Sequence, residues 1–220
     1  MDEKTLIARR VALELRDGDL VNLGIGLPTL VARYIPAGRN IFLQSENGIV
    51  GMAGPVAGAE NRDLTDAGGM PIGAMPGAAA FDSALSFGLI RGGHLDVTVL
   101  GGLQVDEEGR LANWMVPGKM VPGMGGAMDL VSGARKVIVA MQHSARGESK
   151  IVKRCSLPVT SVRRVDLVVT DLAVIQPTGR GLVLKETAPG VTVAQVLANT
   201  GAELIVAGDV PTMPLEGLST

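Results

Sequence analysis

Short apolar runs separated by helical patterns dominate the chain. The apolar runs are typical of buried strands and occupy residues 20–23, 41–44, 95–100, 136–141, 165–170 and 204–206. Apolar residues at helical spacing cover residues 3–16, 29–34, 82–90 and 191–199. Because buried strands that alternate with helices build parallel sheets, this pattern predicts an α/β fold with a mostly parallel sheet covered by helices on both faces.

Two segments depart from this alternation. Residues 174–184 predict a hairpin that turns at Thr178–Gly181. Residues 51–79 are rich in Gly, Ala and Pro and too long for a structureless loop, so we expect them to be folded over a site. No linker or repeat interrupts the chain. We therefore expect one domain over residues 1–220, with a loosely held tail after about residue 210.

Composition and charge limit the kinds of site and partner that the chain is expected to have. Glycine makes up 30 of the 220 residues, about twice its usual share, which favours sites built from tight turns and backbone groups. The chain carries 20 basic and 22 acidic residues, a net charge of −2. This balance gives no overall attraction for a polyanion, so we expect neither nucleic acid nor a membrane as a partner.

The sequence also lacks the usual metal and targeting patterns. The single cysteine, Cys155, excludes an intrachain disulfide, and the two histidines, His94 and His143, form no metal-binding motif. We interpret these three side chains as structural and expect no metal site. The charged N-terminal segment lacks a signal peptide's apolar stretch, and no apolar run is long enough to cross a bilayer. We therefore expect a cytoplasmic protein.

A carboxylate stands at the end of the second predicted strand. Glu46 directly follows this strand and precedes Asn47 and Gly48. Ligand sites in open α/β sheets lie beyond the carboxyl ends of strands, and a glycine here lets the chain turn sharply. Position alone leaves two interpretations open, a reactive carboxylate and an ordinary solvated glutamate in a turn.

The residues around Glu46 bring in a family resemblance. Residues 43–51 read Leu-Gln-Ser-Glu-Asn-Gly-Ile-Val-Gly, which resembles a signature of the family I CoA transferases. The likeness continues over roughly residues 4–210 and includes the segments Gly24–Pro28, Pro76–Ala79, Arg91–His94, Val116–Met120 and Gly123–Asp129. It implies a CoA transferase-like open α/β fold.

The resemblance also implies roles for particular residues. In the family, the glutamate of this signature is the covalent nucleophile, so Glu46 takes that role. The segment 123–129 lies beside the glutamate in the family, which implies that Gly125 or Gly126 offers a backbone amide to the oxyanion. The turn after the first strand borders the cleft, which makes Asn22, Gly24 and Gly26 candidates for substrate binding.

Two further residues are substrate-binding candidates. Asn47 follows the proposed nucleophile, and Gln104 follows a glycine pair. For Gln104, a loop glutamine without a role stays the alternative. A nucleotide-binding turn at Gly24–Gly26 is disfavoured, because Thr29 stands where the third glycine of the dinucleotide pattern belongs.

The chemistry of a glutamate nucleophile is consistent with the rest of the sequence. A carboxylate is already ionised at neutral pH and needs no neighbouring base, and the chain offers no plausible Ser/His/Asp or Cys/His set. Attack on an acyl-CoA leads through an anhydride to a glutamyl–CoA thioester, which predicts ping-pong kinetics. One thioester is exchanged for another, so we expect CoA as a co-substrate and no permanently bound cofactor.

The resemblance finally implies a partner and a substrate class. The glutamate-bearing half works with a homologous alpha subunit, in the family an α2β2 heterotetramer, and transfers CoA between acetoacetate-type acids and another small acid. Succinyl-CoA:3-oxoacid and 3-oxoadipate transferases are alternatives within the family. A sugar-phosphate isomerase or deaminase and a non-catalytic effector-binding domain are alternatives of other classes, permitted by fold-level analogy.

Overall fold

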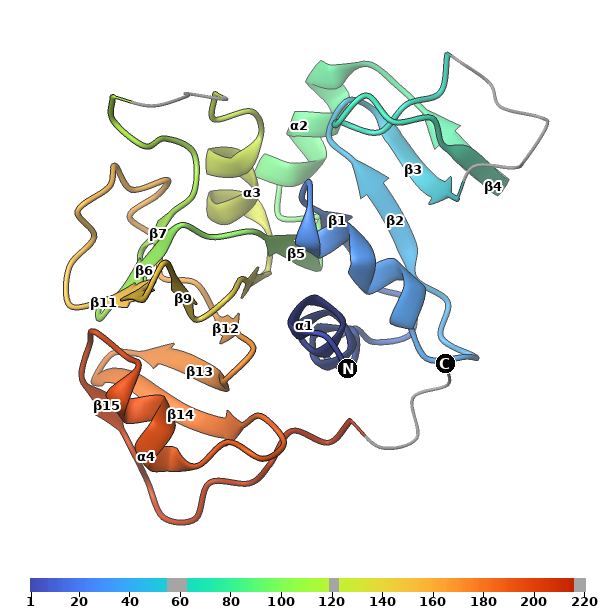
Figure 1. The fold of residues 1–220 in the computed structure, drawn as a ribbon. Helices are drawn as coiled ribbons and strands as arrows, with labels where there is room; N and C mark the ends of the chain where they lie inside the picture. The colour runs from blue at the N-terminus through green and yellow to red at the C-terminus, as the bar shows by residue number, and fades with distance from the viewer. Residues whose placement is uncertain (55–62, 119–122, 216–220) are drawn as a thin grey trace.

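The centre of the fold is a set of five parallel strands (Figure 1). The structure is a computed structural model and describes residues 1–54, 63–118 and 123–215. The parallel strands lie side by side in the spatial order β2 (Phe42–Ser45), β1 (Leu20–Leu23), β5 (Val97–Leu100), β8 (Lys136–Ala140) and β12 (Leu167–Val169). All of β5 is buried, as expected for a strand covered on both faces.

Antiparallel strands extend the parallel set on both sides, so that ten strands of the described chain form one mixed sheet. Beside β2 lie β3 (Ile49–Ala53) and β4 (Gly73–Ala80). Beside β12 lie the antiparallel β13 (Ala173–Thr178) and β14 (Gly181–Thr187), and β15 (Leu204–Ile205) pairs parallel with β14 at the outer edge. The parallel core and the hairpin at Thr178–Gly181 confirm the sequence predictions. Strands β3 and β4 were not predicted; β4 consists mainly of glycine, alanine and proline, which are poor strand formers on their own.

One face of the sheet packs on the N-terminal helix. Helix α1 (Glu3–Ala12) begins at the capping residue Asp2, and the 3₁₀-helix η1 (Leu27–Tyr34) lies beside it. Alternate residues of the central strands face this layer, among them Val97, Val99, Ile138 and Ala140. Helix α1 is shorter than predicted, because Leu13 is already its C-terminal cap.

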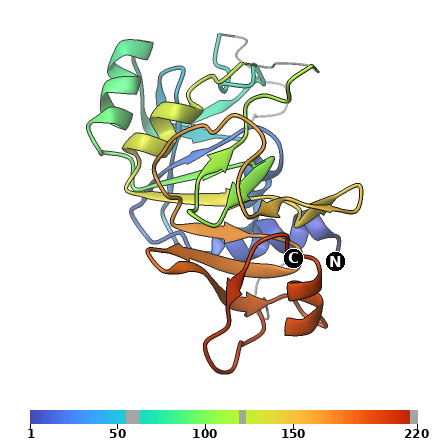
Figure 2. The same ribbon diagram turned by 90° about the vertical axis from the view of Figure 1, so that its left-hand side faces the viewer.

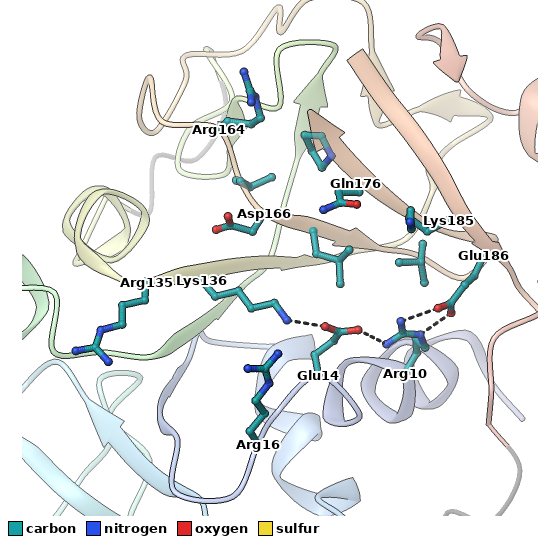
Figure 3. Close-up of a pocket in the computed structure, with 14 residues that line it drawn as sticks. Arg10, Glu14, Arg16, Arg135, Lys136, Arg164, Asp166, Gln176, Lys185 and Glu186 are labelled. Atoms are coloured by element: carbon teal, nitrogen blue, oxygen red, sulfur yellow. Dashed lines mark hydrogen bonds and ion pairs between the residues drawn. The ribbon is translucent and has the colours of Figure 1, made fainter. Parts of the chain in front are cut away.

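A chain of ion pairs links α1 and the residues after it to Lys136 of β8 and Glu186 of β14 (Figure 3). Glu14 binds Lys136 at 2.5 Å and Arg10 at 2.8 Å, and Arg10 binds Glu186 through two hydrogen bonds of 2.6 and 2.8 Å. Burial alone would raise the pKa of Glu14, but the hydrogen bonds from Lys136 and Arg10 outweigh it and hold the pKa below its ordinary value of 4.5. These groups line an open cavity of about 690 Å³.

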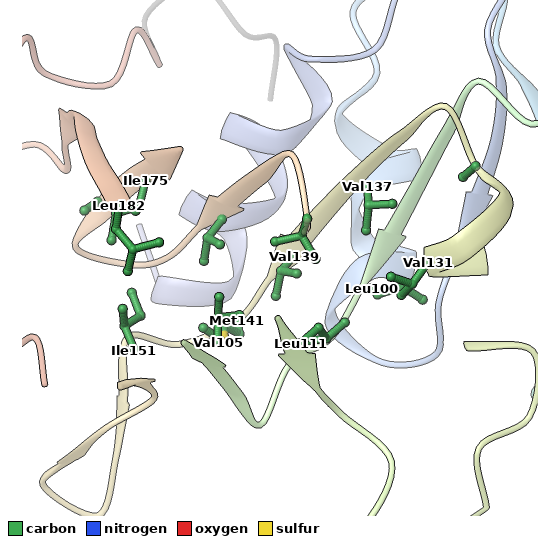
Figure 4. Packing of buried hydrophobic residues seen from close by; sticks show 14 of the residues in the cluster. Leu100, Val105, Leu111, Val131, Val137, Val139, Met141, Ile151, Ile175 and Leu182 are labelled. Atoms are coloured by element: carbon green, nitrogen blue, oxygen red, sulfur yellow. The ribbon is translucent and has the colours of Figure 1, made fainter. Parts of the chain in front are cut away.

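The other face carries a second core (Figure 4). Helices α2 (Ser83–Arg91), α3 (Ala127–Gly133) and α4 (Val193–Ala198) contribute to it, with the small sheet β11 (Ile151–Val152), β6 (Gln104–Asp106) and β7 (Leu111–Ala112). Side chains of the small sheet pack against Val139 and Met141, and in Figure 2 this sheet faces the viewer. Helices therefore cover both faces, as predicted. A short hairpin, β9 (Ser144–Ala145) with β10 (Glu148–Ser149), lies outside both sheets.

Two side chains interpreted as structural are His143, which is buried, and Cys155, which is half-buried. The ring nitrogens of His143 are 2.9 Å from the hydroxyl oxygens of Thr170 and Thr200, and burial lowers its pKa to about 4. Burial raises the pKa of the Cys155 thiol to about 12, with Asp106 adding to the effect. A neutral imidazole and a protonated thiol fit the expectation that these groups serve packing rather than reactivity.

The C-terminal segment is held more firmly than predicted. Thr187 donates its backbone N–H to Pro211 and accepts one from Met213, and Met213 is 3% exposed. The expectation of a loosely held tail is therefore wrong for residues 211–215, because a buried methionine and strand-like hydrogen bonds anchor them. Residues 216–220 lie outside the described residues.

We predict that Glu14→Gln lowers the free energy of unfolding at pH 7 by about 1–3 kcal/mol, because it removes the charge shared by Lys136 and Arg10. The folded pKa of Glu14 is depressed, so its contribution is present above the unfolded pKa and is lost as pH falls through the folded value. Urea unfolding should therefore show a gap between variant and parent at pH 7 that narrows as the pH falls below the ordinary value of 4.5.

Glu108→Gln provides the control, because its side chain is 71% exposed in its pair with Arg110 and exposed pairs contribute little. An equal loss of stability in both variants, or a gap independent of pH, would contradict this account of Glu14.

Candidate active site

Glu46 sits in a tight turn at the carboxyl end of β2. The backbone N–H of Gly48 donates to the carbonyl of Ser45 at 3.0 Å, which closes the turn before β3 begins. Gly48 has φ 127°, and a Cβ there would lie 2.0 Å from the carbonyl oxygen of Phe81. Only glycine fits this position. The sharp turn expected after Glu46 is confirmed.

The side chain of Glu46 is half-buried and meets groups from two other elements. Nδ2 of Asn22, on β1, donates to Oε2 of Glu46 at 3.0 Å, and Asn22 itself is 1% exposed. Gly126, the N-cap residue of α3, lies on another side: a Cβ added to it would be 3.2 Å from Cγ and 3.3 Å from Oε1 of Glu46. A carboxylate held by a buried amide donor and flanked by bare backbone can react and be stabilised in place.

Two buried polar residues behind this contact were not singled out from the sequence. Oε1 of Gln44 accepts from Asn22 at 2.9 Å, and Nε2 of Gln44 donates to the hydroxyl of Ser86 at 2.9 Å. Gln44 is 2% exposed and Ser86 is fully buried. A glutamine inside an apolar strand was the available signal for Gln44, and Ser86 gave none because serine is common in helices.

The described part of the Gly/Ala/Pro segment lies against the turn. Nδ2 of Asn47 donates to the carbonyl of Thr65 at 2.7 Å, and the hydroxyl of Ser45 accepts from the backbone N–H of Ala67 at 2.9 Å. Gly68 lies close to Ile25 of the turn after β1. The expectation that this segment folds over the site is confirmed for residues 63–72, whereas residues 55–62 lie outside the described residues.

The remaining candidates are three glycines and Gln104. Gly24 and Gly26 lie in the turn after β1, at the same edge of the sheet as Glu46; a Cβ on Gly24 would be 3.1 Å from the carbonyl oxygen of Val99, and Gly26 has φ 88°. Gly125 precedes Gly126 with φ 53°, and its added Cβ would meet nothing within 4 Å.

Gln104 is held elsewhere. Its Oε1 accepts from the backbone N–H groups of Ser156 and Leu157, and its Nε2 donates to the Ser156 hydroxyl. Both ends of this amide are used within the protein, so the structure does not bring it to Glu46. Of the resemblance segments, Lys119 and Met120 lie outside the described residues.

Other features of the described chain lie apart from this edge. Lys136 begins β8, so the charged cavity of Figure 3 lies at the amino ends of the parallel strands, whereas Glu46 follows the carboxyl end of β2. Within residues 1–54, 63–118 and 123–215, no group of three or more His, Cys, Asp or Glu residues could hold a metal ion. The same residues contain no helix with the length and apolar character needed to span a bilayer.

Comparison with known proteins gives a consistent result. A family model described as coenzyme A transferase matches residues 4–199. The beta subunit of the acetate CoA-transferase of Escherichia coli (strain K12) is 61% identical over 96% of this chain and 98% of that protein. One subunit of a succinyl-CoA:3-ketoacid coenzyme A transferase of Helicobacter pylori is 52% identical over 91% of this chain and 97% of that protein.

One relative is longer. A mitochondrial succinyl-CoA:3-ketoacid coenzyme A transferase of Mus musculus is 44% identical over 96% of this chain, but the match spans 41% of that protein.

Solved structures show the same fold. The apoenzyme of an acyl-CoA transferase from Escherichia coli O157:H7 has a TM-score of 0.78 at 24% identity and covers 97% of this chain and 44% of its own. A decarboxylase, AibA/AibB, has a TM-score of 0.72 at 20% identity and covers 96% and 88%. At such identities the likeness concerns the fold alone, and the fold expected from the sequence is confirmed. The family match and the identity to the relatives together show that this chain is an enzyme of the coenzyme A transferase family.

Proposed function

We propose that this chain is the glutamate-bearing subunit of a two-subunit CoA transferase, and that Glu46 carries CoA between acids as a covalent thioester. The observation that carries the proposal is the position of the Glu46 carboxylate. It follows the carboxyl end of a parallel strand, accepts a hydrogen bond from buried Asn22 and lies against Gly126. The rest of the mechanism follows from this arrangement.

The reaction proceeds in two equivalent halves. The Glu46 carboxylate attacks the carbonyl carbon of an acyl-CoA, and the C–S bond breaks to leave a mixed anhydride and the CoA thiolate. The thiolate then attacks the Glu46 carbonyl carbon, releasing the first acid and leaving a glutamyl–CoA thioester. An incoming carboxylate reverses these steps and leaves as its CoA ester. Over each half, the C–S bond broken in one thioester is replaced by a C–S bond in the next, so no ATP or metal is consumed.

The second step, in which the CoA thiolate attacks the anhydride, determines which groups must surround Glu46. Attack on the Glu46 carbonyl carbon develops negative charge on a Glu46 oxygen, and Nδ2 of Asn22 is already 3.0 Å from Oε2. A preorganised donor of this kind contributes about 2.7–4 kcal/mol in comparable sites. Main-chain amides at Gly125 and Gly126 are the proposed donors on the other side, and the contact distances favour Gly126.

The relatives support a substrate class and a partner. Their names include acetate and succinyl-CoA:3-ketoacid transferases, and each name describes one subunit of its enzyme. We therefore propose a short-chain or 3-oxo acid of the acetoacetate type as substrate, with Gly24, Gly26 and Asn47 bordering its pocket and CoA as co-substrate. The partner is a homologous alpha subunit in an α2β2 assembly in the cytoplasm. An isomerase or an effector-binding domain finds no support among these relatives.

We predict that Glu46→Gln lowers turnover of the complex by at least about 1,000-fold, since it removes the nucleophile. Incubating the parent complex with acetoacetyl-CoA and no acceptor should attach CoA to this chain, detected by intact-mass spectrometry, and borohydride should inactivate it. Glu148→Gln, an exposed glutamate on β10, should behave as the parent. An adduct mapped to a residue other than Glu46 would refute the assignment.

Gly126→Ala should reduce kcat by about 10- to 100-fold, because its Cβ would press on the Glu46 side chain at 3.2–3.4 Å and displace the carboxylate. Gly125→Ala is the matched comparison: it meets no atom but strains a backbone with φ 53°. That variant should lose about 1 kcal/mol of stability and keep most of its kcat. Steady-state kinetics and thermal melts of both variants separate the two effects; equal kcat losses would contradict this geometry.

Made alone, the chain should show turnover near background, and co-purification with its partner subunit should restore exchange. Light scattering should report the mass of two copies of each subunit, and a panel of acceptor acids identifies the pocket's preference. Full activity of the isolated chain would disprove the two-subunit proposal while leaving the role of Glu46 intact.

A further inference from the structure

A row of polar side chains crosses the buried face of three neighbouring strands. Asn22 on β1 is the register partner of Gln44 on β2 and of Thr98 on β5. The three are 2% exposed or less, and Ser86 of α2, which faces Gln44, is fully buried. Burying polar groups is unfavourable unless they are hydrogen-bonded, so this row needs an explanation.

Part of the row forms a continuous path of hydrogen bonds that ends at Glu46. The Ser86 hydroxyl accepts from Nε2 of Gln44 at 2.9 Å, and Oε1 of Gln44 accepts from Nδ2 of Asn22 at 2.9 Å. The same Nδ2 donates to Oε2 of Glu46 at 3.0 Å. The amino group of Asn22 has two hydrogens, one for Gln44 and one for Glu46.

The path fixes which way each amide points. The backbone carbonyl of Gln44, which can only accept, lies 3.3 Å from Nδ2 of Asn22, and the Gln44 side chain directs Nε2 to the Ser86 hydroxyl and Oε1 to Asn22. That oxygen takes an N–H of Asn22, so the amino group of Asn22, rather than its carbonyl, lies next to Glu46. The reverse orientation would bring the carbonyl oxygen of Asn22 against the carboxylate, which repels it.

We propose that Gln44 and Ser86 are positioning residues, which act through Asn22 to hold the Glu46 side chain in its reactive orientation. The proposal rests on the nucleophilic role of Glu46 proposed above. In that reaction, Glu46 passes from a carboxylate to a neutral anhydride and thioester. It then loses the charge that strengthens its hydrogen bond, so a donor fixed in advance keeps the oxygen in place.

Two orphan atoms argue against a purely stabilising role for the row. Oδ1 of Asn22 and Oγ1 of Thr98 are buried and have no hydrogen-bond partner among the described residues. Such unsatisfied groups are costly, and an apolar row would be more stable. The fold retains the polar groups where they lead to Glu46, which fits a role in function.

The test uses the complex with its partner subunit and three variants in this row. Gln44→Met removes both hydrogen bonds of the amide at similar volume, and Ser86→Ala removes only the hydroxyl to which Nε2 of Gln44 donates. Thr98→Val is the matched control, since it exchanges a buried polar group in the same row that lies outside the path. The rate of CoA loading is followed by intact mass in a single turnover with acetoacetyl-CoA.

We expect Gln44→Met to slow loading about 10- to 100-fold and Ser86→Ala about 3- to 10-fold, as misplacement of a reacting group does. The acetoacetyl-CoA concentration at half-saturation should stay within about twofold in both, because neither residue is proposed to bind substrate. Thr98→Val should load at the parental rate. Thermal melts establish whether each variant is folded. If Gln44→Met does not fold, Ser86→Ala still tests the proposal.

Parental loading rates in the folded Ser86→Ala and Gln44→Met variants would overturn the proposal. So would an equal loss in Thr98→Val, which would assign the effect to packing. Glu46→Gln, measured in parallel, separates this failure from that of the proposed function. If Glu46→Gln forms no adduct while the two path variants load normally, only the positioning role is lost. If Glu46→Gln still loads CoA, the nucleophile assignment fails and the positioning role falls with it.

Discussion

The amide of Asn22 and the carboxylate of Glu46 join the ends of two neighbouring strands. Glu46 comes two residues after Gln44, the register partner of Asn22, so one tight turn is enough to bring the two side chains to 3.0 Å. The turn needs φ 127° at Gly48, against which the carbonyl of Phe81 leaves no room for a side chain. The proposed chemistry thus depends on a backbone shape that only glycine can adopt.

The high glycine content has a physical reason at this edge of the sheet. A Cβ on Gly24 would meet the carbonyl oxygen of Val99 at 3.1 Å, and one on Gly126 would meet Cγ of Glu46 at 3.2 Å. Bare backbone lets three segments approach one another and leaves main-chain amides near the carboxylate. A decarboxylase shares this fold, so the architecture alone does not determine the reaction.

Much of the framework could be predicted from the sequence, because buried parallel strands leave continuous apolar runs such as Val97–Leu100. Strand β4 could not be predicted, since its alanine and glycine residues become a strand only by pairing with β3. Glu46 was found through its strand-end position and its neighbours. Gln44 and Ser86 were missed because the hydrogen bond between them joins elements 42 residues apart in the chain. Gln104 was a candidate from its position after a glycine pair, but its side chain is hydrogen-bonded to a loop 52 residues away.

The buried imidazole between Thr170 and Thr200 has a consequence for interpreting activity against pH. Its pKa is about 4 in the folded chain and 6.5 in the unfolded one, so the unfolded chain takes up the proton first. Lowering the pH below 6.5 therefore reduces the free energy of unfolding. The reduction is on the order of 3 kcal/mol once the pH reaches the folded-state pKa of about 4. Because β5 and β1 lie between β8, which His143 follows, and β2, which Glu46 follows, activity lost in mild acid can reflect loss of the fold rather than titration of a group beside Glu46. An acidic limb in a rate profile then needs a parallel stability measurement before any group is assigned to it.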